Sequence, residues 1–473
     1  MKKADIGLIG LGVMGENLIL NMEKNGYTVA CFNRTTSKIT SFLETRAKNK
    51  NIIGCYSLTE LASCLKKPRK VLLMVKAGDA VDQTINNLLS VLDKGDIIID
   101  GGNSNFLDTI RRYNALAEEG IMFLGMGVSG GEEGALNGPS LMPGGSKEAY
   151  NHLEEMLNKI SAKTADGHCC SCYIGDNGAG HFVKMVHNGI EYGDMQLICE
   201  SFDLMRKLLK LSNKEMADVY ADWNKGELDS YLIEITKNIL AYKENNSYLV
   251  DYILDTAGQK GTGKWTSIES LNESVPLTLI SEAVYARFLS SLKDERVEAS
   301  KHFQKEDIVF NGDKKEFIED IRKALYASKI ISYAQGYALM MQAAKTYGWN
   351  LDFGNIALIW RGGCIIRSRF LGKIKEAFVN NPSLNNLMLD PYFRSVLLDA
   401  SASFRKVVAM GVLNGIALPA MSSALAYFDG YTSAILPANL LQAQRDYFGA
   451  HTYERIDCPR GEFYHTNWMG EKE

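Results

Sequence analysis

Five polar side chains recur along one predicted helix at the spacing of a single helical face. Lys184, His187, Asn188, Glu191 and Tyr192 lie at positions i, i+3, i+4, i+7 and i+8, which is the spacing that usually carries the apolar, core-facing stripe of a helix. The residues between them are mostly apolar. We therefore interpret the helix as mostly buried, with its polar stripe facing a cavity. The alternative is a solvated face with a Lys–Glu pair, which would contribute roughly a few tenths of a kcal/mol.

A buried stripe of this kind suits acid–base chemistry. Burial disfavours the charged form of a lysine and lowers its pKa toward neutrality, which would make Lys184 a general base. Glu191, two turns further along the same face, could act as the general acid. The pair would support deprotonation of a hydroxyl group, hydride transfer to a nicotinamide and protonation of a carbon at a second position.

A glycine-rich motif follows the first predicted strand and begins a helix. Its members are Gly10, Leu11, Gly12, Val13, Met14 and Gly15. In this pattern the first glycine permits a tight turn, the second lets the backbone approach a pyrophosphate, and the third allows close helix–strand packing. The N-terminus of the helix then faces the phosphate charge. At the start of a β-α-β pattern the motif predicts a dinucleotide site, and a glycine-rich packing turn is the alternative.

The end of the second predicted strand discriminates between two cofactors. An NAD site usually places Asp or Glu there, where the carboxylate binds the ribose 2′-hydroxyl. This sequence has Asn33, Arg34 and Thr35 instead. A guanidinium and two neutral hydrogen-bonding side chains would attract a 2′-phosphate, which a carboxylate would repel. We therefore predict NADP as the cofactor, and Arg34 as a solvated surface residue is the alternative.

Three further loops lie at the C-terminal ends of later predicted strands, where ligands of open α/β sheets bind. They contain Val75, Lys76, Ala77 and Gly78 in the first, Asn103 in the second, and Ser129, Gly130 and Gly131 in the third. Each combines small residues with a polar side chain and leaves backbone N–H groups accessible to an anion or amide. Each alone is typical of an ordinary turn, but we expect all three at the same edge of one sheet.

These loops need a parallel sheet to position them. The segments 4–10, 27–33, 70–76, 96–100 and 121–128 are apolar at nearly every position, as strands buried on both faces of a parallel sheet are. The segments between them are long enough for crossover helices. Residues 1–176 are therefore predicted to form a doubly wound, Rossmann-like α/β domain that binds the dinucleotide.

The next part of the chain is predicted to be all-helical. Residues 177–433 show long helical patterns with few prolines, and we expect a domain for substrate binding and dimerisation. Lys329 and Tyr337 repeat the eight-residue spacing of Lys184 and Tyr192, which suggests an internal duplication. Chance similarity between amphipathic helices is the alternative.

Two clusters outside the stripe could bind anions. The segment around Lys260 is dense in Gly, Lys and Thr and resembles a phosphate-binding nest. The C-terminal tail, residues 434–473, looks too small and irregular to fold alone. It contains Arg445 and His451, which are two further anion-binding candidates. Surface basic residues are the alternative in each case.

Composition excludes several classes of protein. The chain has 473 residues, with 52 basic, 56 acidic and a net charge of −4, so we expect neither nucleic acid nor an anionic membrane as a partner. Its length predicts two or three domains, and no apolar run approaches the roughly 20 residues that cross a bilayer. Nine cysteines without framework spacing are typical of reduced thiols in the cytoplasm. Cys169, Cys170 and Cys172 lack the spacing of zinc ligands, so we predict no metal site.

The motifs occur in an order that resembles one enzyme family. Between residues 8 and 455 the chain contains LIGLGVMGENL, FNRT, VKAG, DGGNS, VSGGEEGA, KMVHNGIEYGDMQ, DTAGQKGTGKW and QRDYFGAHTYER. This series is similar, nearly end to end, to the decarboxylating 6-phosphogluconate dehydrogenases. The resemblance implies a homodimer that oxidatively decarboxylates 6-phosphogluconate to ribulose 5-phosphate and CO2 with NADP, without a metal, in the pentose phosphate pathway.

The resemblance also implies roles for individual residues. Lys184 would take the proton of the C3 hydroxyl group, and Glu191 would protonate C1 of the enediol that remains after CO2 leaves. The carboxylate and hydroxyl groups of the substrate would be bound by Asn103, Ser129, Gly130, Gly131, His187 and Asn188. Its phosphate end would be bound by Tyr192, Lys260, Arg287, Arg445 and His451. Arg287 has no motif of its own, and the two tail residues would reach the site of the partner subunit.

Two other functions stay open from the residues alone. A non-decarboxylating β-hydroxyacid dehydrogenase would share the glycine motif and the lysine-bearing helix, but its substrates are smaller and generally carry no phosphate. Lys260, Arg445 and His451 argue against it. A non-catalytic NADPH-sensing protein would need the cofactor site but no acid–base pair, whereas this chain has both Lys184 and Glu191.

Overall fold

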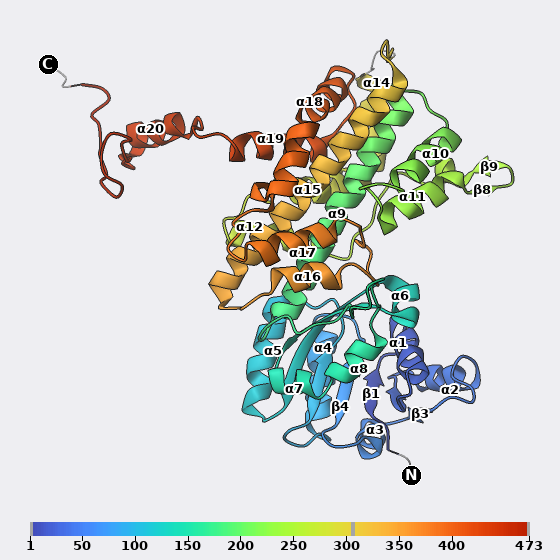
Figure 1. Cartoon of the computed structure of the whole chain (residues 1–473). Helices are drawn as coiled ribbons and strands as arrows, with labels where there is room; N and C mark the ends of the chain where they lie inside the picture. The colour runs from blue at the N-terminus through green and yellow to red at the C-terminus, as the bar shows by residue number, and fades with distance from the viewer. Residues whose placement is uncertain (1–2, 304–307, 471–473) are drawn as a thin grey trace. The chain divides into compact units, whose positions relative to one another are not determined.

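The computed structural model describes residues 3–303 and 308–470 of the chain (Figure 1). The chain divides into two compact units, Met1–Ala424 and Leu425–Glu473, and each is described by itself. Among the described residues, no helix combines the length and the apolar character that a membrane span requires. The domain boundaries predicted after residues 176 and 433 stay predictions.

The first unit begins with a seven-stranded sheet in the order β3-β2-β1-β4-β5-β6-β7. Its strands are β1 (Ile6–Ile9), β2 (Val29–Phe32), β3 (Ile52–Cys55), β4 (Lys70–Leu73), β5 (Ile97–Asp100), β6 (Met122–Ser129) and β7 (Ser140–Gly145). All neighbours are parallel except β6 and β7. The strand order reverses between β1 and β4, and ligands of open α/β sheets bind at such a switch point. The predicted doubly wound fold is confirmed.

Helices cover both faces of this sheet (Figure 1). One face packs against α1 (Val13–Lys24), α2 (Thr36–Glu44), α6 (Gly131–Asn137), α7 (Lys147–Asn151) and α8 (Glu154–Ile160). The other face packs against α3 (Leu58–Cys64), α4 (Asp79–Leu89) and α5 (Phe106–Glu118). Because both faces are buried, the strands are apolar at successive positions, which explains why their periodicity was readable in the sequence.

The sequence missed β3 and β7 and overestimated the length of another strand. β3 is a short edge strand whose first three residues are only half-buried, so it lacks the continuous apolar run of its neighbours. β7 contains Pro143, Gly144 and Gly145, which usually interrupt strands, but proline is tolerated at a sheet edge. The predicted strand 70–76 ends at Leu73, so Val75 and Lys76 lie in the following loop.

The sheet is followed by a large helical region. Its elements are α9 (Ala179–Asp203), a π-helical turn (Leu204–Leu208), α10 (Asn213–Trp223), α11 (Tyr231–Ala241), a hairpin of β8 (Lys243–Glu244) and β9 (Ser247–Tyr248), a 3-10 turn (Leu249–Tyr252), α12 (Thr262–Asn272), α13 (Thr278–Ser291), α14 (Lys293–His302), α15 (Lys314–Tyr347), α16 (Phe353–Ile359), α17 (Leu371–Asn380), a 3-10 turn (Leu387–Leu389), α18 (Pro391–Leu413) and α19 (Pro419–Tyr431). The prediction of a large helical region is confirmed, and the described residues add a hairpin of two short strands that was not expected.

Two long helices, α9 and α15, pack against each other at the centre of this region (Figure 1). The Asp313 side chain accepts hydrogen bonds from the first-turn N–H groups of α15, and Gly348, with φ of 70°, ends that helix. These are the usual start and stop signals of a helix. α9 also packs against β6 and β7, so it belongs to the contact surface between sheet and helices.

Small residues allow α9 to approach the sheet at backbone distance. A Cβ atom at Gly180 would overlap the carbonyl oxygens of Gly125 and Met142, and a Cβ atom at Gly127 would overlap the side chain of Lys184. Any larger residue at these positions would push the helix away from β6. The glycines of both elements therefore fix where Lys184 lies relative to the sheet.

The second unit is organised around one buried carboxylate. It contains α20 (Ala438–Gly449), from which Asp446 accepts hydrogen bonds from the N–H groups of Thr452 and Thr466 at 3.0 and 3.1 Å. The side chains of His465 and Trp468 also contact this carboxylate, both at 2.9 Å. Although burial raises the pKa of Asp446, these hydrogen bonds lower it below its ordinary value overall.

Candidate active site

The polar stripe of α9 is buried, as its pattern predicts. Lys184 is 6% exposed and His187 is fully buried, while Asn188 and Tyr192 are also buried and Glu191 is half-buried. The neighbours that face this stripe belong to the end of β6 and the start of α12. A row of five polar groups inside the protein must be stabilised by hydrogen bonds or by loss of charge.

Lys184 lies without a hydrogen-bonded partner among the residues that the structure describes. Burial lowers the pKa of its ammonium group, whereas the charges of Glu191 and Cys364 partly oppose this shift. The net direction favours the neutral amine, which is the form that can accept a proton. Lys329, its counterpart on α15, instead forms a buried ion pair with Asp194.

Glu191 has the opposite shift. Burial raises the pKa of its carboxyl group, Lys184 and Arg287 lower it in part, and Asp194 adds a further rise. The side chain of Glu191 is 22% exposed, and its Oε2 lies 4.0 Å from Nδ1 of His187. A half-buried carboxyl group that holds its proton can donate it to a carbon atom.

A chain of hydrogen bonds crosses α9 beside these two groups. Oγ of Ser129 lies 3.4 Å from Nε2 of His187, and Nδ1 of His187 lies 3.0 Å from Oδ1 of Asn188. The Asn188 amide donates to Oγ1 of Thr262 at 3.1 Å. Burial and the charge of Lys184 lower the pKa of His187 well below its ordinary value, so this imidazole is neutral. Thr262 was missed in the sequence, although it follows Gly261 in the motif around Lys260.

Arg287, on α13, joins the stripe at Tyr192. Its guanidinium carbon lies 3.4 Å from the centroid of the Tyr192 ring, and its Nη1 donates to the carbonyl oxygen of Gly258 at 3.2 Å. Gly263 also lies close to this ring, because a Cβ atom there would approach the ring atoms of Tyr192 to 2.6 Å. The structure thus brings together three segments that are far apart in the sequence.

A cavity of about 470 Å³ lies at the switch point of the sheet. The predicted residues that line it are Gly10, Leu11, Gly12, Asn33, Arg34, Thr35, Val75 and Lys76. Three other members of the glycine motif lie elsewhere: Val13 is 56% exposed, Met14 packs on the core and Gly15 is buried against Gly10. They shape the start of α1 without lining this cavity.

The same cavity has a second wall that the sequence analysis missed. Ala80, Gln83, Thr84 and Asn87 of α4 line it at the spacing i, i+3, i+4 and i+7, which is the spacing of one helical face. Lys38, in the first turns of α2, adds a second cation beside Arg34. A search for small and polar residues at helical spacing could have found the α4 wall.

The residues of this cavity fit an NADP molecule. Gly10 has φ of 111°, and a Cβ atom there would overlap the carbonyl oxygen of Met74. At Gly12, the N-cap of α1, a Cβ atom would meet no atom within 4 Å, so the helix N-terminus is open to a phosphate. Asn33 Oδ1 accepts a hydrogen bond from Leu11 N–H at 3.0 Å, which ties the glycine loop to β2. The lining residues include Arg34 and Lys38 but no carboxylate.

A second cavity, of about 550 Å³, shares Val75 and Lys76 with the first. Its lining also includes Ala77, Gly78, Asn103, Asn105, Asp108, Lys260 and Trp265. Three predicted elements therefore meet here: the loop after β4, the loop after β5 and the segment around Lys260. Asn105, Asp108 and Trp265 were not among the predicted site residues.

The remaining candidates divide between the two units. Ser129 is buried at the end of β6, and Gly130 and Gly131 follow with φ of 118° and 61° at the start of α6. Arg445 and His451 belong to the second unit, where both are exposed. The Arg445 guanidinium donates to Gln442 at 3.0 Å. Their predicted role at another subunit's site stays a prediction.

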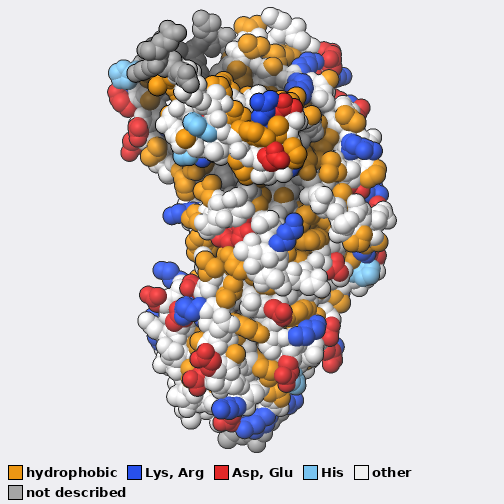
Figure 2. Space-filling model, turned by 90° about the vertical axis from the view of Figure 1, so that its left-hand side faces the viewer, with side chains coloured by type: hydrophobic (Ala, Val, Ile, Leu, Met, Phe, Trp, Pro, Cys, Tyr) orange, Lys and Arg blue, Asp and Glu red, His pale blue; other side chains and the backbone are white. Residues whose placement is uncertain are grey.

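Charged side chains of both signs are interspersed with hydrophobic ones on the face drawn in Figure 2. Among the described residues, no group of three or more His, Cys, Asp or Glu side chains has the arrangement of a metal site. The buried row on α9 is therefore the chemically distinctive feature of the first unit, together with the two adjoining cavities.

Comparisons with known proteins agree over almost the whole chain. The model of the NAD binding domain of 6-phosphogluconate dehydrogenase matches residues 5–175, and the model of the C-terminal domain of 6-phosphogluconate dehydrogenase matches residues 180–468. The decarboxylating 6-phosphogluconate dehydrogenase of Ovis aries is 59% identical over 472 residues, 99% of this chain and 98% of that protein. The enzyme of the same name from Haemophilus influenzae is 60% identical over 469 residues, 99% of this chain and 97% of that protein.

A solved structure shows the same fold. The 6-phosphogluconate dehydrogenase of Plasmodium falciparum, determined in its apo form and with NADP+ or 6-phosphogluconate, superposes with a TM-score of 0.95. It is 48% identical, and the alignment covers 98% of this chain and 100% of that chain.

Proposed function

The chain belongs to the 6-phosphogluconate dehydrogenase family, and from this premise we propose how its residues carry out the reaction. The reaction is the NADP-dependent oxidative decarboxylation of 6-phosphogluconate to ribulose 5-phosphate and CO2. The observation that carries the proposal is the buried pair on α9, Lys184 and Glu191, whose pKa values are shifted in opposite directions.

Lys184 is the general base. Its burial favours the neutral amine, which accepts the proton of the C3 hydroxyl group while hydride leaves C3. NADP, when bound, accepts that hydride. The product of the step is a β-keto acid, and its C1–C2 bond then breaks to release CO2. The electron pair of that bond forms a double bond between C2 and C3, the π pair of the C3 carbonyl group moves onto its oxygen, and Lys184 returns the proton to that oxygen.

Glu191 is the general acid. Its raised pKa keeps a proton available, and it transfers this proton to the carbon that has lost CO2, which is C1 of the enediol. The hydroxyl group on the former C3 then gives its proton to the neutral Lys184, and the ketone of ribulose 5-phosphate forms at that carbon. The two residues therefore need opposite protonation states at the start of turnover, which is the direction of their two pKa shifts.

The other predicted residues bind the substrate. We assign its carboxylate and hydroxyl groups to side chains and N–H groups around the end of β6 and the stripe: Asn103, Ser129, Gly130, Gly131, His187 and Asn188. Its phosphate is assigned to Tyr192, Lys260 and Arg287, together with the partner's tail. The close contact of Arg287 with Tyr192 and with Gly258 supports one common phosphate site.

The cofactor cavity would hold NADP through three features of the chain. Gly10 and Gly12 leave room for the pyrophosphate at the N-terminus of α1. Arg34 and Lys38 would bind the 2′-phosphate. The loop of Val75, Lys76 and Ala77 would lie beside the nicotinamide, because it joins the two cavities.

One assay tests the function. Purified protein is incubated with NADP and 6-phosphogluconate in the presence of a metal chelator, and NADPH and CO2 are measured together. We expect equal amounts of both products, whereas NADPH without CO2 would indicate a non-decarboxylating dehydrogenase. Lys184→Met is expected to lower kcat by about 100- to 10,000-fold while NADP still binds. Unchanged turnover in this variant would exclude Lys184 as the base.

The protein is proposed to work as a homodimer in which Arg445 and His451 reach the partner's site. Both side chains are exposed in a small unit with its own hydrogen-bonded centre, which suits a segment that is presented to another surface. We also propose that the enzyme works in the cytoplasm, since its nine cysteines are free thiols and reduced thiols are typical of that compartment.

Mixing two variants that are each impaired tests the cross-subunit site. Lys184→Met and Arg445→Ala are purified separately and mixed under conditions that allow subunit exchange. If Arg445 serves its partner, a mixed dimer has one site with both residues intact, and activity returns. A mixture of Lys184→Met with Glu191→Gln is the matched control, because both changes lie on the same helix and no mixed dimer has an intact site. The proposal would be contradicted if activity did not return in the first mixture, or if it returned equally in the control mixture.

A further inference from the structure

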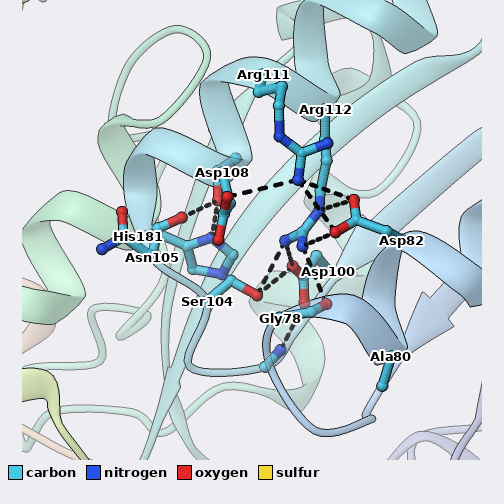
Figure 3. A network of polar contacts seen from close by, with 12 residues as sticks. Gly78, Ala80, Asp82, Asp100, Ser104, Asn105, Asp108, Arg111, Arg112 and His181 are labelled. Carbon is cyan, nitrogen blue, oxygen red and sulfur yellow. Dashed lines mark hydrogen bonds and ion pairs between the residues drawn. The ribbon is translucent and has the colours of Figure 1, made fainter.

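A buried arginine on α5 joins the loops that carry the cofactor and substrate residues. Arg112 is 2% exposed and forms two parallel hydrogen bonds with Asp82 of α4, from Nε to Oδ1 at 2.8 Å and from Nη2 to Oδ2 at 2.9 Å (Figure 3). Its Nη2 also donates to the carbonyl oxygen of Gly78 at 3.2 Å. One side of the guanidinium therefore holds the loop after β4, which ends at Gly78.

The remaining nitrogen of the same guanidinium faces the loop after β5. Nη1 of Arg112 lies 3.5 Å from Oγ of Ser104 and 3.5 Å from Oδ2 of Asp100 (Figure 3). Ser104 donates to Asp100 at 2.6 Å, and Asp100 accepts the N–H of Gly102 at 3.0 Å. The loop that carries Asn103 is thus fixed on both sides of that residue.

A neighbouring residue of α5 extends the connection to the catalytic helix. Oγ1 of Thr109 lies 2.7 Å from Nδ1 of His181, which belongs to the first turn of α9. His181 is buried, and burial lowers the pKa of its imidazole. Lys184 follows one turn later. The same face of α5 therefore contacts the loop after β4, the loop after β5 and the start of α9.

Arg112 itself lines neither cavity, whereas both loops that it holds do. We propose that Arg112 is a positioning residue that fixes the loops 75–78 and 100–104 at the separation needed for hydride transfer from substrate to cofactor. The inference rests on the proposed function, since it assigns the first loop to the nicotinamide and Asn103 to the substrate. An error of about 1 Å in such a separation can cost about 100-fold in rate.

The adjacent arginine provides a matched control. Arg111 also contacts Asp82, with Nη2 3.0 Å from both carboxylate oxygens, but its side chain is 57% exposed. The described residues give it no contact with either loop. Substituting it alters its ion pairs with Asp82 and with Asp108, which lies 3.4 Å from its Nη2, but changes no contact that joins the two loops.

The test uses Arg112→Lys, which keeps the charge but lacks the planar guanidinium fork that reaches Asp82, Gly78 and Ser104 together. The rate of NADPH formation is measured with 6-phosphogluconate and with the same substrate deuterated at C3, at saturating concentrations. We expect kcat to fall about 100-fold and the deuterium isotope effect on kcat to rise, because hydride transfer becomes slower than the other steps. Arg111→Lys should match the wild type in both measurements.

A second variant covers the case in which Arg112→Lys does not fold. Ser104→Ala removes one of the two contacts of Arg112 with the loop after β5 and leaves those with Asp100 and Asp82 in place. It should lower kcat and raise the isotope effect to a smaller extent. A purely structural Arg112 would lower the amount of folded enzyme with an unchanged isotope effect, and that result in both variants would overturn the inference. Each variant is compared with active wild-type enzyme, so a wild type that does not oxidise 6-phosphogluconate contradicts the proposed function instead.

Discussion

Arg287 lies with its guanidinium carbon 3.4 Å from the centroid of the Tyr192 ring. The two residues come from different helices, α13 and α9, and Arg287 is also fixed by the carbonyl oxygen of Gly258. The N–H groups at the edge of a stacked guanidinium can donate to a phosphate; here Nη1 donates to Gly258 and Nη2 faces Sδ of Met195 at 3.5 Å. The stacking contact holds the Arg287 and Tyr192 side chains together, so the predicted phosphate site would lie at the Tyr192 end of the polar stripe on α9.

Arg287→Lys is therefore expected to weaken substrate binding. Lysine keeps the charge but loses the planar stacking and the two-pronged hydrogen bonding. A lost charge-assisted hydrogen bond costs about 1.5–3 kcal/mol, so KM for 6-phosphogluconate should rise about 10- to 100-fold, while KM for NADP stays the same. Arg322→Lys, at an arginine that pairs with Glu319 on α15, is the control. A larger rise in KM for NADP than in KM for 6-phosphogluconate would contradict the assignment of Arg287 to the substrate phosphate.

The pH dependence of hydride transfer should stay the same in Glu191→Gln. Activity falls at low pH as Lys184 becomes protonated. In the proposed mechanism Glu191 holds its proton at the start of turnover, so the neutral amide of Gln replaces a neutral carboxyl group. The acidic limb of the profile should therefore stay in place, whereas an ionised Glu191 would raise the pKa of Lys184. The measurement is the first turnover of NADPH formation across a pH series, since Glu191 acts only after hydride has left.

Steady-state turnover of the same variant should fall by about 100- to 10,000-fold, because the general acid is absent. The first turnover should be much less affected. An acidic limb that moves to lower pH would show that Glu191 is ionised and raises the pKa of Lys184, which would contradict the proposed protonation states.

Arg34 and Lys38 should determine the preference for NADP. Arg34→Ala and Lys38→Ala each remove a cation from the cofactor cavity. At about 1.5–3 kcal/mol for a charged hydrogen bond, each should weaken NADP binding about 10- to 100-fold and leave NAD binding unchanged. The affinities for NADP and for NAD are measured by titrating each cofactor into the protein and following the protein fluorescence. Lys48→Ala, at an exposed lysine outside the cavity, is the control and should not change the affinity for either cofactor. If Arg34→Ala and Lys38→Ala weakened NAD binding as much as NADP binding, the assignment of these residues to the 2′-phosphate would be refuted.

The buried Lys329–Asp194 pair should contribute to stability rather than to chemistry. Removing one partner of a buried ion pair leaves an uncompensated charge, so Lys329→Met should lower the free energy of unfolding by about 3–5 kcal/mol. The double variant Lys329→Met/Asp194→Leu should recover part of this loss. Thermal and urea unfolding measure both variants.

Lys184→Met is the matched comparison for that experiment. Since Lys184 has no hydrogen-bonded partner among the described residues, this variant should not lower the Tm even though it strongly lowers kcat. Such a separation of activity from stability is typical of a functional residue. A loss of Tm as large as that of Lys329→Met would contradict the difference between the two lysines.

Asp446→Ala should disturb the second unit. Asp446 accepts hydrogen bonds from Thr452, His465, Thr466 and Trp468, and Arg445 is its neighbour in the chain. If the tail binds substrate, KM for 6-phosphogluconate should rise in Asp446→Ala, as we also expect for Arg445→Ala. The measurement is kcat/KM for 6-phosphogluconate at several pH values. Glu462→Gln, at an exposed carboxylate of the same unit, is the control, and a wild-type KM in Asp446→Ala would exclude this role.

Features that depend on local spacing could be predicted from the sequence. The Gly10 to Gly15 motif and the stripe on α9 each lie within one element, whose periodicity specifies which residues share a face. The parallel strands were readable because both of their faces are buried. β3 and β7 were missed because edge strands lack that continuous apolar pattern, and their pairing depends on neighbours distant in the chain.

The family motifs, and the two lysines that stand eight residues before a tyrosine, could be recognised from the order of the residues alone. Folding gives Lys329 the buried partner Asp194, whereas Lys184 has no ion pair or hydrogen bond among the residues that the structure describes. Folding also brings Arg287 and Arg112, which have no motif, into contact with the site and its loops. These differences arise because pKa values and hydrogen bonds depend on which groups lie within a few ångströms after packing.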